Sequence, residues 1–152
     1  MIKVFGIGNT LLSDDGIGIK VAKYLLENKH MINKNIDIII GEKDYVNCIN
    51  NIEEGDEVII INSTYFNIPP GMITKTSLEN FAEAVSGDIT SNDIKFLNSL
   101  RKKYKKVTGY LIGIEIDKID YSINLSERLN EKFYDICYSV VRKINEILSK
   151  KE

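Results

Sequence analysis

Two adjacent carboxylates, Asp14 and Asp15, lie in the glycine-rich stretch GIGNTLLSDDGIG near the start of the chain, at residues 6–18. Carboxylates in a loop can bind a cation, and one of them can act as a general acid or base. Glycines directly after an apolar strand are also typical of loops that bind nucleotide phosphates. The stretch is therefore either a cation-facing acidic loop or a nucleotide loop.

The glycine spacing favours the first alternative. A dinucleotide fingerprint requires G-x-G-x-x-G, and here Gly6 and Gly8 are present but Leu11 occupies the third position. Carboxylates at the start of a helix also repel a phosphate from the site that it would use. Glu42, which follows the second apolar run, could imitate the acid that binds a ribose, so a nucleotide-binding α/β domain stays an alternative. In a third interpretation the acidic pair only caps the helix.

The hydrophobic pattern predicts the elements that must position these residues. Short apolar runs at residues 2–7, 36–40, 57–61 and 107–114 indicate parallel strands that are covered on both faces. Residues 72–75, which follow a Pro-Pro-Gly turn, are expected to form an edge strand. Apolar residues at helical spacing span residues 16–26, 45–52 and 94–104, and a long final helix capped by Ser126 runs to Leu148. We expect one domain over residues 1–152, an α/β fold with a three-layer α/β/α sandwich and a mostly parallel doubly wound sheet.

The fold predicts where a ligand would bind. In open α/β sheets, ligands lie beyond the carboxyl ends of the strands near a reversal of strand order. The acidic loop and the residues after Ile61 both emerge at that edge. His30, the single histidine, follows the first helix and is expected at the opposite edge.

Composition excludes several kinds of partner. Twenty basic and 22 acidic residues give a net charge of -2, so we expect neither a nucleic-acid partner nor a membrane partner. Cys48 and Cys137 are far apart, with no second cysteine or histidine at ligand spacing. They are typical of core residues in a reduced, cytoplasmic protein.

Three segments resemble the maturation endopeptidases of nickel-iron hydrogenases. The first contains Gly6-Ile7-Gly8-Asn9, the pair Asp14-Asp15 and Gly18. The second is GDEVIIINSTYFNIPPG and the third is GYLIGIEIDKIDYSINLSERL, and the three follow the family's order along nearly the whole chain. The resemblance implies a hydrolase that removes a C-terminal extension from the nickel-loaded precursor of the hydrogenase large subunit.

The resemblance also implies a site. In this family an acidic residue of the first loop, an aspartate after the third core strand and a later histidine sense the nickel that the substrate presents. These positions fall on Asp15, on Asn62 and near Asp88, so an asparagine replaces one carboxylate and no histidine is present. The implied metal ligands Asp15, Asn62 and Asp88 would form an all-oxygen set. Asp14, the neighbour of Asp15, is expected to cap the helix.

The chemistry follows from what the sequence contains. It holds no Ser-His-Asp, Cys-His or His-Glu-x-x-His arrangement. Cleavage would therefore use a water activated by a carboxylate or by the metal, with Asp15 as the catalytic acid or base. The alternative is a non-catalytic relative that keeps the fold and precursor binding but has lost nickel sensing, because of Asn62 and the missing histidine.

Overall fold

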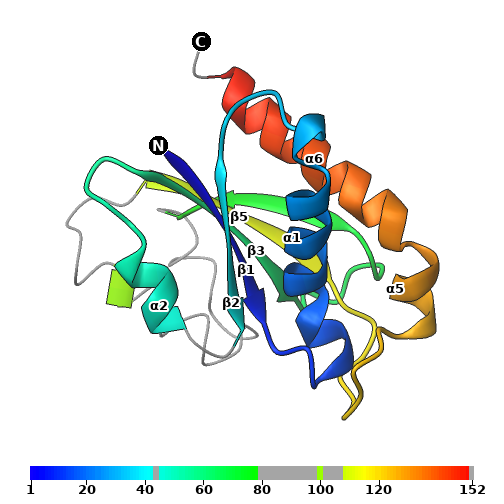
Figure 1. Cartoon of the computed structure of the whole chain (residues 1–152). Coiled ribbons are helices and arrows are strands. Elements are labelled where there is room, and N and C mark those ends of the chain that lie inside the picture. The colour runs from blue at the N-terminus through cyan, green and yellow to red at the C-terminus, as the bar shows by residue number, and fades with distance from the viewer. Residues whose placement is uncertain (43–44, 79–98, 101–107, 151–152) are drawn as a thin grey trace.

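The computed structural model describes residues 1–42, 45–78, 99–100 and 108–150, and these form a twisted sheet with helices on both faces (Figure 1). The strands are β1 (Ile2–Gly8), β2 (Asp37–Glu42), β3 (Glu57–Thr64), β4 (Ile73–Ser77) and β5 (Thr108–Glu115), in the order β2-β1-β3-β5-β4. The first three and β5 are parallel, and β4 is antiparallel to β5 at one edge. The expected parallel strands and the expected edge strand are confirmed.

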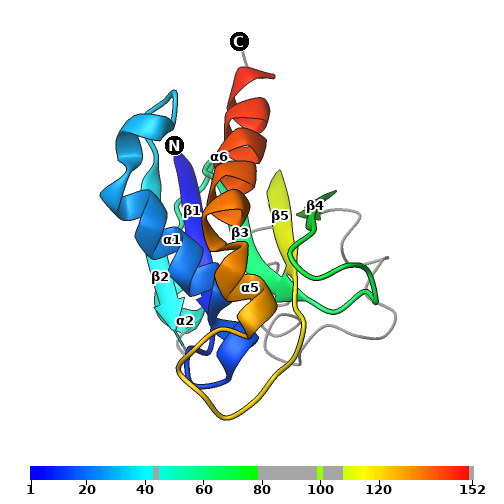
Figure 2. The same ribbon diagram turned by 90° about the vertical axis from the view of Figure 1, so that its right-hand side faces the viewer.

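Helices cover the sheet on both faces, as the three-layer prediction requires. They are the 3-10 turn η1 (Ser13–Gly16), α1 (Ile17–Glu27), the turn η2 (Lys29–Met31), α2 (Tyr45–Asn50), α5 (Glu127–Glu131) and α6 (Phe133–Ser149). Figure 2 shows α1 and α6 side by side over one face. On β3, Ile59 and Ile61 join the apolar cluster under α1 and α6, whereas Val58 and Ile60 join the cluster on the α2 side. This alternation determines the direction of every polar side chain at the end of β3.

Two helix predictions need adjustment. Ser126 begins the C-terminal helix as expected, since its Oγ accepts from the Leu129 amide at 3.4 Å, but the helix is divided at Lys132 (φ -94°, ψ 2°) into α5 and α6. The helix expected over 94–104 lies outside the described residues except for 99 and 100, which are helical. Among the described residues, no helix has the length and apolar character needed to cross a membrane.

One glycine brings α1 into direct contact with the sheet at the point where strand order reverses. A Cβ on Gly18 would lie 2.4 Å from the carbonyl oxygen of Ile61 and 2.7 Å from that of Ile7. Only a residue without a side chain allows this approach. The start of α1 therefore lies over the boundary between β1 and β3, which is where a doubly wound fold places its ligand.

Candidate functional site

Asp15 connects the loop that follows β1 to the carboxyl end of β3. It lies in η1, half-buried, and its Oδ1 accepts a hydrogen bond from Ser63 Oγ at 3.0 Å while its Oδ2 accepts one from the Asn9 amide at 3.1 Å. Burial raises the pKa of Asp15, and the hydrogen bonds from Ser63 and Asn9 offset part of that rise. A carboxyl group with a raised pKa is a stronger base than an ordinary carboxylate and is better suited to accepting and returning a proton.

Ser63, and not Asn62, is the β3 residue that contacts Asp15. The Asn62 side chain is buried, and its Oδ1 accepts from the Ser63 amide at 2.8 Å. Because residues alternate along a strand, Ser63 shares the α1 side with Ile61, while Asn62 shares the α2 side with Ile60. The sequence reasoning missed Ser63, although the alternation of Ile59, Ile61 and Ser63 could have indicated it.

The metal ligand set stays a prediction. Asp88 lies outside the described residues. Within the described part of the chain, no group of three or more His, Cys, Asp or Glu residues is placed to hold a metal ion. Asp15 and Asn62 alone therefore do not make a resident metal site, and a metal bound here would need ligands from elsewhere.

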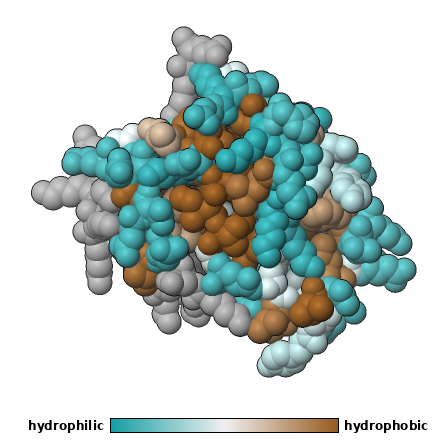
Figure 3. All heavy atoms as spheres, in the orientation of Figure 1, coloured by the Kyte–Doolittle hydropathy of each residue, from teal (hydrophilic) through white to brown (hydrophobic). Residues whose placement is uncertain are grey.

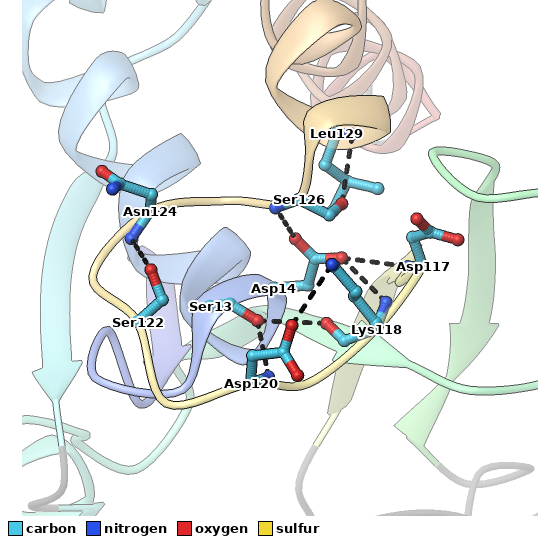
Figure 4. Close-up of polar contacts among 9 residues, drawn as sticks. All are labelled: Ser13, Asp14, Asp117, Lys118, Asp120, Ser122, Asn124, Ser126 and Leu129. Atoms are coloured by element: carbon cyan, nitrogen blue, oxygen red, sulfur yellow. Dashed lines mark hydrogen bonds and ion pairs between the residues drawn. The ribbon is translucent and has the colours of Figure 1, made fainter.

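Asp14 does not cap α1, so that prediction is wrong. The residue before α1 is Gly16, with no side-chain cap, and the fully buried Asp14 carboxylate instead accepts three backbone hydrogen bonds from the loop after β5 (Figure 4). Its Oδ1 accepts from Ser126 at 2.7 Å, and its Oδ2 accepts from Asp117 at 3.0 Å and from Lys118 at 3.1 Å. The 3-10 turn directs this side chain away from the helix and toward that loop.

Ser13 reinforces the same connection. Its Oγ donates to the Lys118 carbonyl at 3.1 Å and accepts from the Asp120 amide at 3.0 Å. Its own amide donates to the Ser122 carbonyl at 2.7 Å, and the Ser122 amide donates to the Leu11 carbonyl at 3.1 Å. The acidic loop and the loop after β5 thus form one hydrogen-bonded unit.

A second buried carboxylate holds the other loop beside the site. Glu115, at the end of β5, accepts from Thr64 Oγ1 at 3.1 Å and from the Phe66 amide at 2.9 Å. It also accepts from the Ile68 amide at 3.3 Å. The loop after β3 is therefore attached to β5. The two buried acids, Asp14 and Glu115, fix the surroundings of Asp15 without being free for chemistry.

The backbone amides of residues 9–13, in the first part of the acidic loop, have acceptors within the chain. Thr10 donates to Glu42 through its amide at 3.3 Å and through its hydroxyl group. The other loop amides donate to Asp15 (from Asn9), to Asn9 Oδ1 (from Leu11), to the Asn9 carbonyl (from Leu12) and to the Ser122 carbonyl (from Ser13). A phosphate loop needs such amides for its ligand. The amides of residues 9–13 are therefore occupied, and nucleotide binding would depend on the amides at the start of α1.

Comparison with solved structures shows which proteins share this fold. No protein-family model matches the chain. In structure it is similar to the hydrogenase maturating endopeptidase HybD from E. coli, with a TM-score of 0.76, 19% identity and coverage of 95% of this chain and 92% of that one. It is also similar to the [NiFe] hydrogenase maturation protease HybD from Thermococcus kodakarensis, with a TM-score of 0.68, 23% identity and coverage of 98% and 97%. The chain has the fold of hydrogenase maturation proteases.

Similarity in sequence points in the same direction. The chain is 28% identical over 72 residues to the hydrogenase expression/formation protein HupD of Bradyrhizobium diazoefficiens. That match covers 47% of this chain and 37% of the relative, so it spans little more than a third of HupD. The resemblance noted in the sequence is thus confirmed by similarity in sequence and in fold.

Proposed function

We propose that this protein is a hydrogenase maturation endopeptidase that removes a C-terminal extension from the precursor of a hydrogenase large subunit. Nickel belongs to the substrate in this reaction. The observation that carries the proposal is the place of Asp15, a half-buried carboxyl group with a raised pKa over the boundary between β1 and β3. In doubly wound folds, ligands bind at such a boundary.

Asp15 supplies the acid and base chemistry in this proposal. As a base it takes a proton from the water that attacks the scissile carbonyl, and as an acid it returns that proton to the leaving amine. Ser63 Oγ and the Asn9 amide each hold one of its oxygens, so the carboxylate plane is oriented before the substrate arrives. Its oxygens would also meet the substrate's nickel, with Asn62 and Asp88 as further proposed ligands.

Cleavage of the precursor tests this function. Purified protein is incubated with nickel-loaded and with nickel-free precursor, and the products are measured by mass spectrometry. We expect wild-type protein to shorten only the nickel-loaded form, and Asp15→Asn to reduce the rate by at least about 100-fold, as loss of a general acid or base does. Asp120→Asn removes an exposed carboxylate from the neighbouring loop and should leave the rate unchanged. An intact nickel-loaded precursor after prolonged incubation would refute the proposal.

A non-catalytic relative is the second candidate. Asn62 motivates it, because its carbonyl oxygen brings no charge and already accepts from the Ser63 amide. Such a protein would bind the precursor without shortening it. The same incubation followed by co-purification separates the two functions. We place either function in the cytoplasm, in keeping with the two buried free cysteines.

A further inference from the structure

The outer edge of β2 is an apolar strand edge. In the described part of the chain, β2 pairs with β1 on one side and with no strand on the other (Figure 1). Its centre consists of Ile38, Ile39 and Ile40, all of them half-buried. Figure 3 shows an apolar area over β2, between α2 and α1, that is open to view. Backbone donors and acceptors on such an edge can pair with another extended chain.

The opposite edge of the sheet is built differently. There the sequence Ile73–Ser77 of β4 is mostly polar, with Lys75 at its centre. Polar strands with a lysine are protected against pairing at an edge. In β2 no charged residue or proline lies between Asp37 and Glu42. One edge of this sheet is thus protected, and the other is suited to receive a strand.

The β2 edge leads to the candidate site. Its last residue, Glu42, accepts hydrogen bonds from the amide and the hydroxyl group of Thr10. Thr10 directly follows Asn9, whose amide donates to Asp15 at 3.1 Å. Glu42, at the carboxyl end of β2, and Asp15 therefore accept hydrogen bonds from two successive amides of one loop.

We infer that the outer edge of β2 binds an extended segment of the precursor polypeptide as an additional strand and so leads the chain to Asp15. The inference rests on the proposed function. Backbone hydrogen bonds would supply affinity, and β-branched or aromatic side chains of the segment would pack on Ile38, Ile39 and Ile40. Asp37 and Glu42 carry negative charge at the two ends of the edge, so basic residues should flank the paired segment.

Sheet geometry gives the length of chain between the edge and the site. Neighbouring strands are about 4.8 Å apart, so an added strand lies about 12 Å from the boundary between β1 and β3, two and a half spacings away. An extended chain advances about 3.3 Å per residue. The segment delivered to Asp15 should therefore begin about four residues after the residues that pair with β2.

Hydrogen exchange and matched variants test the inference. The probe is the nickel-loaded large-subunit precursor, and amide exchange of β2 is measured with and without it. We expect the precursor to slow amide exchange within Asp37–Glu42. The Ile39→Lys variant should bind the precursor at least about tenfold more weakly, because charged edge residues oppose strand pairing. Ile39→Thr loses similar apolar area but keeps a neutral β-branched residue, and its binding should stay within about threefold. Thr76→Lys adds the same charge to the β4 edge as a control and should bind normally.

The outcomes separate this inference from the proposed function. Equal binding and cleavage by wild type and Ile39→Lys, without protection at β2, would overturn strand addition and leave the endopeptidase standing. Protection at β2 without cleavage would support strand addition and refute the endopeptidase. Protection of β2 in the protein alone, rising with its concentration, would identify a second copy as the occupant and overturn the inference. Wild-type protein that neither binds nor cleaves would overturn both. If Ile39→Lys fails to fold, the exchange measurement on the wild-type protein still decides whether the precursor pairs with β2.

Discussion

Replacement of Asp14 by asparagine tests whether this buried carboxylate holds the loop after β5. Asp14 is fully buried, and its two oxygens accept from three backbone amides, those of Ser126, Asp117 and Lys118. Asparagine has nearly the same shape, but one of the two oxygens becomes an amide nitrogen that can only donate. Whichever way the new amide turns, at least one backbone N–H faces a donor.

The magnitude follows from the number of amides that lose their acceptor. With the asparagine oxygen in the place of Oδ2, only the Ser126 amide is left without a partner, whereas the other orientation strands the amides of Asp117 and Lys118. A buried donor without an acceptor costs about 1–3 kcal/mol. Since the lower-energy orientation strands one amide, we expect Asp14→Asn to lower the free energy of unfolding by about 2 kcal/mol. Asp14→Ala strands all three and should cost about 6 kcal/mol by the same count.

Urea unfolding followed by circular dichroism measures this loss, and hydrogen exchange locates it at the Ser126 amide. Asp120→Asn is the matched control in the same loop. Its carboxylate is 58% exposed and lies 3.3 Å from Lys118 Nζ, so its removal should change stability by less than about 0.5 kcal/mol. A wild-type unfolding midpoint for Asp14→Asn, with an unchanged urea dependence, would show that the loop does not depend on these hydrogen bonds.

Three further predictions concern Asp15, Gly18 and Asp56. Burial raises the pKa of Asp15 above 3.8 in the folded state, so the folded state binds the proton more tightly than the unfolded state. The free energy of unfolding of the wild type, relative to Asp15→Asn, should therefore fall as pH rises through the range above 3.8. A difference between the two proteins that does not depend on pH in urea titrations would contradict this. Gly18→Ala forces a Cβ to within 2.4 Å of the Ile61 carbonyl oxygen and should destabilise the protein by about 2 kcal/mol in thermal unfolding, whereas a neutral result would refute the tight packing of α1. Burial tends to raise the pKa of Asp56, but the hydrogen bond from the Glu53 amide and the contact with Lys3 lower it overall, so its stabilisation should be complete above pH 3.8 and be lost as pH falls through the lowered pKa. Asp56→Asn leaves the buried Lys3 ammonium group without its carboxylate partner 3.1 Å away and should cost about 3 kcal/mol at pH 7. Urea midpoints should show that this cost shrinks as pH falls through the lowered pKa of Asp56.

Most of the fold could be predicted because its signals are local. Near-continuous apolar runs such as residues 57–61 are typical of strands covered on both faces, and the turn Pro69-Pro70-Gly71 indicated an edge strand after it. The spacing of apolar residues indicated α1 and the C-terminal helix within one or two residues at their starts. The division at Lys132 was not predictable, since the apolar stripe continues through it and only the local backbone angles change.

The sequence by itself determined the class of fold, the edge of the sheet where the acidic loop emerges and the resemblance to hydrogenase maturation proteases. It determined these because strand and helix periods, turn residues and motif order are all written along the chain. Only the tertiary structure decided what each carboxylate does. Asp14 and Asp15 are neighbours, yet the first meets the amide of Ser126, 112 residues away, and the second meets the hydroxyl group of Ser63. A buried carboxylate takes its donors from whichever distant segments packing brings to it, and the alternation of a strand decides between adjacent residues such as Asn62 and Ser63.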